Sequence, residues 1–407
     1  MLVYPLQKLI HLRKDTPDGI AAIYINSALR TFAVSLVGIF LPVFLFLRAQ
    51  DLFGKGIHYG FYGIIIYFLI HRIVVTLSIL PAAKIISKIG FRWSIFTANV
   101  LLIALLGLLS LANDVIWVIP LAAFLHGLQN PLYWLSYRSL FATEGVLSNI
   151  GREVGFSAIS TQLAGIAGPV LGGVIITIWG FPALFIVALI VVIISGVPFF
   201  FMSKHKHEYA VKIKDVIEWL KKPKHRNEEL AFLGRRVDDF VVSLFWPVFV
   251  FLVLGNFEKQ GLVASLGLVA STVMVYIAGR TFDTKHSYKA YKFGVVGNSI
   301  VWIIRGFGRN LSQLLMIETG AAIVSPFYWV TFDSLLYERV RDKDENIVVF
   351  MIGRHLVVNV AMYVVLLIAF IVAKYDFRFW ILWITASLGT LSTLYMWEKK
   401  KPHEKKR

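Results

Sequence analysis

The chain has 407 residues, of which 57% are hydrophobic and only 16% are charged, and its mean hydropathy is +0.71. So few polar side chains cannot cover the surface of a water-soluble protein, and the composition therefore predicts an integral membrane protein. Lys and Arg outnumber Asp and Glu by 41 to 24. In a soluble protein this excess would indicate nucleic-acid binding, but membrane proteins concentrate it in cytoplasmic loops. The absence of cysteine excludes disulfides, thiolate metal sites and cysteine nucleophiles.

Apolar stretches long enough to cross a bilayer follow one another along the chain. A membrane-spanning α-helix needs about 20 mostly apolar residues. Cutting the chain at charged breaks and at breaks rich in glycine or proline leaves these candidate spans: 20–47, 57–81, 94–112, 115–141, 154–178, 182–202, 230–254, 261–279, 288–308, 311–337, 347–373 and 376–397. The predicted fold class is an all-α integral membrane protein with twelve transmembrane helices.

The basic residues orient these helices. Counted from a cytoplasmic N-terminus, the stretch 203–229 faces the cytoplasm and holds eight basic residues, whereas no loop expected outside holds more than two. Because cytoplasmic loops carry the excess of Lys and Arg, this distribution predicts an even number of spans with both termini in the cytoplasm. We expect the protein to lie in the plasma (inner) membrane.

The polar stretch between the sixth and seventh spans also predicts the domain organisation. Apolar side chains recur at helical spacing among its lysines, which predicts an amphipathic helix on the inner leaflet, its basic side toward anionic lipid. The expected parts are an N-terminal six-helix bundle over 1–202, a cytoplasmic linker over 203–229, a C-terminal six-helix bundle over 230–397 and a basic cytoplasmic tail over 398–407.

The two halves share an internal repeat. Residues 40–47 (FLPVFLFL) read almost as residues 245–252 (FWPVFVFL), and the same offset places Arg30 on Arg235. A repeat of this length predicts that the two bundles are pseudo-symmetric.

A second pair of matching segments places opposite charges at equivalent positions. Residues 131–140 match residues 326–335, both with Tyr-Trp shortly after Pro, and Arg138 falls on Asp333. We expect these two charges to attract each other near the cytoplasmic ends of their helices; the alternative is that each pairs on its own helix.

Two motifs resemble those of one large transporter family. Residues 165–173 (GIAGPVLGG) are similar to the antiporter motif of the major facilitator superfamily, whose core is Gly-Pro-x-x-Gly-Gly, and residues 279–285 resemble its signature loop Gly-x-x-x-Asp-Arg-x-Gly-Arg. The resemblance is to drug or metabolite:proton antiporters and implies two six-helix bundles around a central cavity. The small residues also predict close helix packing. The motif residues are Gly165, Gly168, Pro169, Gly172, Gly173, Gly279 and Asp283.

Polar and charged side chains inside the spans indicate a functional site, because each ionised group costs roughly 2.5–3.5 kcal/mol to insert. The resemblance implies that the first, fourth, seventh and tenth helices line the cavity. The candidate substrate residues on these helices are Arg30, His126, Asn130, Tyr133, Arg138, Arg235, Glu318, Tyr328 and Asp333.

Asp238 and Asp239 are the candidate proton-coupling residues, because a carboxyl group in a low-dielectric cavity can hold a proton near neutral pH. Arg235 lies four residues before Asp239 on one helix, and an interpretation equally open is that the two simply neutralise each other. In that case Asp238 is expected to have no partner on its own helix. His126 has the alternative role of a helix–helix contact.

The predicted function is secondary active transport of a small organic solute by alternating access, coupled to protons. The resemblance of residues 165–173 to the antiporter motif implies export. No phosphate-binding loop and no hydrolase motif occurs, so we expect neither ATP use nor enzymatic activity. The expected partners are the solute, protons and the lipid bilayer, with no cofactor, metal or nucleic acid, and the protein is expected to be a monomer.

Other functions stay open on the sequence alone. Arg30 and Arg235 resemble the paired arginines of organophosphate exchangers, and guanidinium groups suit phosphate or carboxylate. This arrangement would make the protein an organic-anion exchanger. A lipid flippase or a non-transporting membrane protein is the remaining alternative.

Overall fold

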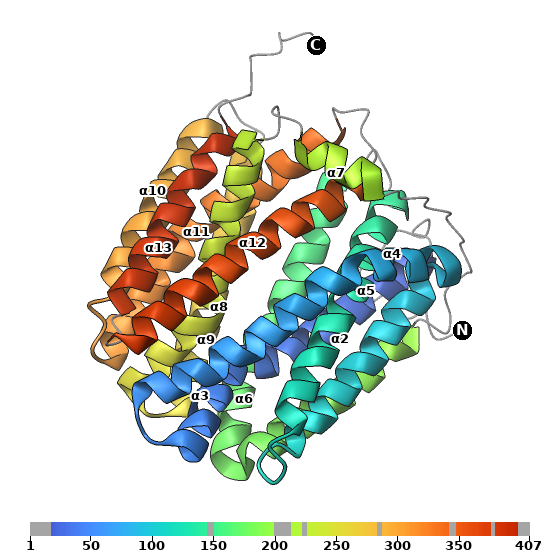
Figure 1. Cartoon of the computed structure of the whole chain (residues 1–407). Helices are drawn as coiled ribbons and strands as arrows, with labels where there is room; N and C mark the ends of the chain where they lie inside the picture. Colours follow the sequence, from blue (N-terminus) through green and yellow to red (C-terminus); the bar gives the residue numbers. More distant parts are fainter. Residues whose placement is uncertain are drawn as a thin grey trace. The chain divides into compact units, whose positions relative to one another are not determined.

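The computed structural model describes residues 18–144, 150–198, 213–221, 226–282, 287–341, 347–375 and 379–397 (Figure 1). Every element in this part of the chain is a helix. The helices before residue 200 are α2 (Asp18–Gly38), α3 (Phe40–Phe53), α4 (Ile57–Ser110), α5 (Val118–Glu144) and α6 (Ile150–Gly196). Those after it are α7 (Ile213–Lys221), α8 (Arg226–Leu254), α9 (Phe257–Phe282), α10 (Ser287–Arg305), α11 (Leu311–Arg341), α12 (Ile347–Lys374), α13 (Phe379–Ser392) and the 3₁₀ helix η3 (Thr393–Met396).

The helices coincide with the described parts of the predicted spans, and two of them hold two spans each; residues 199–202 and 376–378 of these spans lie outside the described residues. Gly90 divides α4 with φ 79° and ψ 168°, and Gly180 divides α6 with φ 79° and ψ 177°. Positive φ costs glycine little because it has no Cβ, so the chain can turn sharply there without a loop. The breaks lie between predicted spans 2 and 3 and between spans 5 and 6.

The first predicted span, by contrast, is divided between two helices. α2 ends at Gly38, and α3 begins at Phe40. Pro42 follows two residues later; it has no N–H to donate to the carbonyl of Gly38, which weakens the helix at this point.

Eight stretches of the described residues are helices long and apolar enough to cross a membrane, and the kinked α4 and α6 are among them. Their outward side chains include exposed Leu77, Ile190 and Leu367. Exposed aliphatic side chains of this kind are suited to lipid rather than water.

Contacts group the chain into two compact units. Unit 1 comprises Met1–Gly38 and Ile70–Ala210, and unit 2 comprises Ile39–Leu69 and Val211–Arg407. The segment 39–69 belongs to unit 2 although it precedes most of unit 1 in sequence. The predicted domain boundaries remain predictions.

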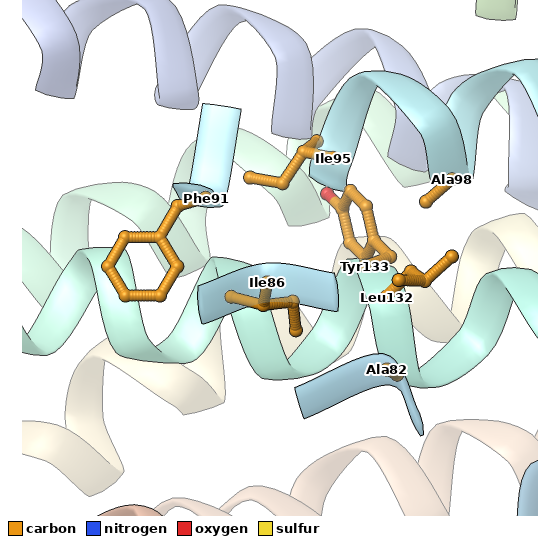
Figure 2. Close-up of a cluster of buried hydrophobic side chains, with 7 residues drawn as sticks. All are labelled: Ala82, Ile86, Phe91, Ile95, Ala98, Leu132 and Tyr133. Atoms are coloured by element: carbon orange, nitrogen blue, oxygen red, sulfur yellow. The ribbon is translucent and has the colours of Figure 1, made fainter. Parts of the chain in front are cut away.

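Unit 1 is held by close helix packing. α2 packs along α6, and a Cβ placed on Gly168 would lie 2.8 Å from the backbone carbonyl carbon of Ser35. A second contact is the apolar cluster of Figure 2, in which side chains from both sides of the Gly90 kink meet those of α5. The cluster consists of Ala82, Ile86, Phe91, Ile95, Ala98, Leu132 and Tyr133.

Unit 2 is held largely by aromatic side chains. α8 packs against α12 and α13, and α10 packs against α11 and α13 (Figure 1). The segment 39–69 joins this unit through ring contacts, such as Phe61 with Phe245 at 5.8 Å and Phe68 with Phe240 at 6.0 Å between centroids.

The predicted amphipathic linker helix is present as α7, but its apolar face does not simply lie on lipid. Val216 and Trp219 are buried, and the Trp219 ring lies 5.4 Å from that of Phe350 on α12. A Cβ on Gly353 would come within 2.3 Å of the Trp219 ring, so this glycine makes room for it. Of the apolar side chains described on α7, Ile217 remains exposed.

Candidate functional site

Unit 1 contains a buried arginine surrounded by uncharged groups, which we call the Arg30 cluster: Arg30, Asn99, Gln129 and Tyr133. Arg30 on α2 donates hydrogen bonds to Asn99 Oδ1 on α4 and, at 2.7 Å, to Gln129 Oε1 on α5. Its guanidinium lies 3.7 Å from the centre of the Tyr133 ring, a cation–π distance. The same ring also packs within the apolar cluster (Figure 2).

The remaining predicted residues of α5 lie along the same helix. The His126 ring stacks on His71 of α4 with centroids 4.1 Å apart, which is a helix–helix contact. Tyr133 stacks on Tyr137 at 5.8 Å, and Asn130 is partly buried. The side chain of Arg138 lies outside the described residues, so its pairing with Asp333 stays a prediction.

Unit 2 contains a buried carboxylate that links three helices, the Asp238 network. Asp238 on α8 accepts hydrogen bonds from Trp302 Nε1, from Asn298 Nδ2 at 3.1 Å and from Thr390 Oγ1 at 3.2 Å. Trp302 and Asn298 lie on α10 and Thr390 lies on α13. In turn Asn298 Oδ1 accepts a hydrogen bond from Ser325 on α11, at 2.7 Å.

Arg235 is shared between the two neighbouring acids. It donates to Asp239 Oδ1, and its NH1 also lies 3.3 Å from Asp238 Oδ2. Arg235 and Asp239 therefore form the ion pair that their spacing of four residues predicts. The expectation that Asp238 has no partner on its helix is wrong, because a spacing of three residues also brings two side chains together on a helix.

The two acids differ in their access to the surroundings. The side chain of Asp239 is 31% exposed and that of Asp238 only 9%. Asp239 also lies 3.7 Å from Arg236. Of the two carboxylates, Asp239 is therefore the one that water can reach more easily.

A second ion pair of unit 2 involves Glu318. Its Oε2 accepts a hydrogen bond from Trp246 Nε1 at 3.1 Å and lies 3.6 Å from Arg305 NH2. The Arg305 guanidinium lies 4.5 Å from the Trp246 ring and 4.1 Å from the Trp302 ring. Gly267 on α9 makes room for this pair, since a Cβ there would come within 2.6 Å of Glu318 Cγ.

The last two predicted residues lie on α11 near Arg235. The Tyr328 ring is buried 5.0 Å from the Arg235 guanidinium, and Asp333 is close enough for its charge to act on Arg235. Arg235 therefore faces acidic and aromatic groups, whereas Arg30 faces only uncharged ones. The two arginines match in sequence but not in surroundings.

The motif residues on α6 are buried, and Gly168 packs against Ser35 of α2. Gly168, Pro169, Gly172 and Gly173 are buried on α6, and Gly165 is buried one turn earlier. Gly279 has open space around it, and Asp283 lies outside the described residues.

The uncharged partners in these sites were not predicted from the sequence. Asn99, Gln129 and Asn298 are amides in otherwise apolar spans. Because polar groups in lipid must find partners within the protein, an isolated amide in a span is a signal that could have found them.

Apolar helices that enclose buried ion pairs are typical of membrane proteins whose spans contain a functional site. The chain matches the family model of the Major Facilitator Superfamily over residues 23–257, and it belongs to this family. It is accordingly a secondary transporter rather than an enzyme.

The fold agrees with this assignment. The structure is similar to that of a variant of the E. coli fucose:proton symporter, with a TM-score of 0.64 and 11% sequence identity over 93% of this chain and 97% of the other. At this identity the likeness shows the fold alone. No curated protein matches the chain in sequence.

Proposed function

We propose that the protein is a proton-coupled transporter that exports a small organic solute by alternating access. The observation that carries the coupling is the sharing of Arg235 between Asp238 and Asp239 within one membrane span. The resemblance of residues 165–173 to an antiporter motif favours export. The structural neighbour is itself named as a proton symporter, which favours protons as the coupling ion.

Asp239 is the better candidate for the group that exchanges the proton, because it is the more exposed of the two acids. When Asp239 takes up a proton it loses its charge, and Arg235 then keeps an ion pair only with Asp238 among these two acids. Loss of the proton restores competition between the two carboxylates for one guanidinium. Protonation thus changes the ion pairs of Arg235 on α8, and such a change can shift the equilibrium between the two conformations of alternating access.

The test uses the full chain, purified and reconstituted in liposomes with an imposed pH gradient and a pH-sensitive dye inside. Small aromatic acids, amides and amines that raise the temperature of thermal unfolding are the solutes. We expect addition of solute to dissipate the pH gradient across liposomes that contain the native protein. We expect Asp239→Asn to bind solute and exchange it without a gradient, yet to show no flux driven by the pH gradient.

Two further variants make the result specific. Asp238→Asn should lose gradient-driven flux and also unfold at a lower temperature, because its interhelical donors lose a charged acceptor. Asp114→Asn, an exposed acid outside the spans, is the matched control and should behave as the native protein. Full gradient-driven flux in both Asp239→Asn and Asp238→Asn would remove this cluster from proton coupling.

The paired-arginine version of anion exchange is not favoured by these surroundings. Arg235 already contacts two carboxylates, so its charge is neutralised before any solute binds. Flippase and non-transporting functions receive no specific support from the site.

A further inference from the structure

The membrane spans of unit 1 contain no acidic residue. Residues 19–38, 70–112, 115–143 and 154–202 include neither Asp nor Glu. The same segments carry the buried side chain of Arg30, which is 6% exposed. The Arg30 guanidinium therefore lies within membrane spans whose own sequence supplies no acidic residue to balance it.

Arg30 shows this imbalance most clearly. Among the described side chains no carboxylate lies within ion-pair distance of it, and its polar contacts are the amide oxygens of Asn99 and Gln129. An ionised group removed from water is costly unless it is paired, and two neutral acceptors with one aromatic ring offset only part of that cost. By contrast, Arg235 in unit 2 contacts two carboxylates.

A second observation points to a missing acceptor at the same place. The Asn99 side chain is only 2% exposed, and its oxygen accepts a hydrogen bond from Arg30. Its Nδ2 has no hydrogen-bond acceptor among the described residues. A buried donor in this state carries a desolvation cost that a suitable ligand would remove. A guanidinium beside an unused amide N–H is a donor set suited to the oxygens of an anion.

We propose that the Arg30 cluster is a binding site for an organic anion, a carboxylate or a phosphate monoester, whose oxygens take Arg30 and Asn99 Nδ2 as donors. The Tyr133 ring beneath Arg30, stacked on Tyr137, gives the site an aromatic side. The site therefore suits an anion attached to an apolar or aromatic group. The inference rests on the proposed transport function, since the anion would be the exported solute.

The test measures binding without transport, on the full chain purified in detergent. The probes are benzoate and phenyl phosphate, with neutral benzamide and cationic benzylamine as matched compounds, and the readout is the temperature of thermal unfolding by tryptophan fluorescence. We expect one or both anions to raise this temperature and the other two compounds to leave it unchanged. Comparison of benzoate with phenyl phosphate distinguishes carboxylate from phosphate.

Three variants assign the response to the cluster. Arg30→Gln should weaken anion binding about tenfold or more, because a hydrogen bond to a charged group is lost. Asn99→Asp should abolish the response to anions and raise the unfolding temperature of the ligand-free protein, because it supplies the missing negative charge. Arg309→Gln, an exposed arginine of unit 2, should keep the native response.

Several outcomes would overturn the proposal. One is equal stabilisation by benzamide and benzoate, and another is an unchanged anion response in Arg30→Gln or Asn99→Asp. A lower unfolding temperature of ligand-free Asn99→Asp would show that the cluster does not lack negative charge, even if no probe binds. Anion binding without any proton-coupled flux would leave this site standing and remove only the proposed coupling.

Discussion

Trp302 connects two charged groups that lie on different helices. Its Nε1 donates a hydrogen bond to Asp238, and the face of its ring lies 4.1 Å from the Arg305 guanidinium. The indole ring is fully buried and stacks on Trp383, with centroids 5.5 Å apart. One side chain thus holds an acid through its edge and a base through its face.

Phenylalanine in place of Trp302 keeps an aromatic ring but cannot donate the hydrogen bond to Asp238. Trp302→Phe should destabilise the protein by about 1–3 kcal/mol, because the charged acceptor Asp238 loses a donor. Thermal unfolding of the purified protein measures this as a lower transition temperature.

Trp383→Phe is the matched control for this substitution. Trp383 is equally buried, but its Nε1 has no hydrogen-bond partner among the described residues. The substitution removes the same atoms without removing a hydrogen bond, so it should cost clearly less. Equal losses in the two variants would show that packing, and not the bond to Asp238, decides the effect of Trp302→Phe.

Charged side chains were the part of the candidate site that sequence could identify. Arg30, Asp238 and Glu318 stand out because ionised residues are rare in apolar spans. Their partners could not be assigned in the same way, since Trp302 reaches Asp238 across 64 positions of sequence. A tryptophan in a span is compatible with lipid contact, packing or hydrogen bonding, and only the fold decides among these.

At the scale of elements, α2 approaches α6 most closely, among the motif glycines described, at Gly168. Gly168 leaves room for the backbone of Ser35, whereas Gly165, one turn earlier, has its nearest neighbour, Thr31 Cγ2, 3.9 Å from an added Cβ. The two glycines of one motif therefore differ in how closely another helix approaches them.

A pair of alanine substitutions tests this difference. Gly168→Ala should destabilise the protein by about 1–3 kcal/mol, because α2 and α6 must separate to admit the methyl group. Gly165→Ala should be neutral or slightly stabilising, since an alanine favours the helix and fits the space. Both are measured as shifts in thermal unfolding temperature. A similar loss at the two positions would contradict a specific role for Gly168.

The predicted spans agree with the helices because length and hydropathy determine where a chain can cross a bilayer. The joins between spans were less predictable. Gly90 and Gly180 turn the chain inside continuous helices through a positive φ, and many other glycines of the sequence do not adopt this conformation. Which glycine adopts positive φ depends on the packing around it and cannot be read from its identity alone.

At the scale of the molecule, the segment 39–69 is the part whose contacts could not be predicted. By sequence it belongs to the expected N-terminal bundle, yet it packs within unit 2. Its contacts include Phe40 with Phe257 and Tyr62 with Phe370, and Gln260 Nε2 donates a hydrogen bond to the carbonyl of Ile39 at 3.4 Å. Apolar patterning identifies the rings but not their partners.

A cross-link between this segment and α8 tests whether these contacts must open during transport. The chain has no native cysteine, so Phe61→Cys with Phe245→Cys gives one reactive pair, at a site where the native rings are 5.8 Å apart. A short bifunctional thiol reagent should stop solute flux in liposomes, and a reducible reagent should allow recovery on reduction.

The control pair lies entirely within the C-terminal half. Phe249→Cys with Phe379→Cys replaces rings 5.0 Å apart on α8 and α13, and its cross-link should leave most of the flux. Undiminished flux through the cross-linked 61–245 pair would show that this contact stays closed throughout the cycle.

The ring contacts of the segment 39–69 also give the conformational equilibrium a particular dependence on temperature. A conformation that separates Phe61 from Phe245 and Phe379 and admits water between them hydrates their faces, and hydration of apolar surface raises the heat capacity. Apolar association near room temperature is driven by entropy and weakens on cooling. Cold therefore favours the separated rings over the packed ones. The free-energy difference between the two conformations is therefore a curved, not a linear, function of temperature.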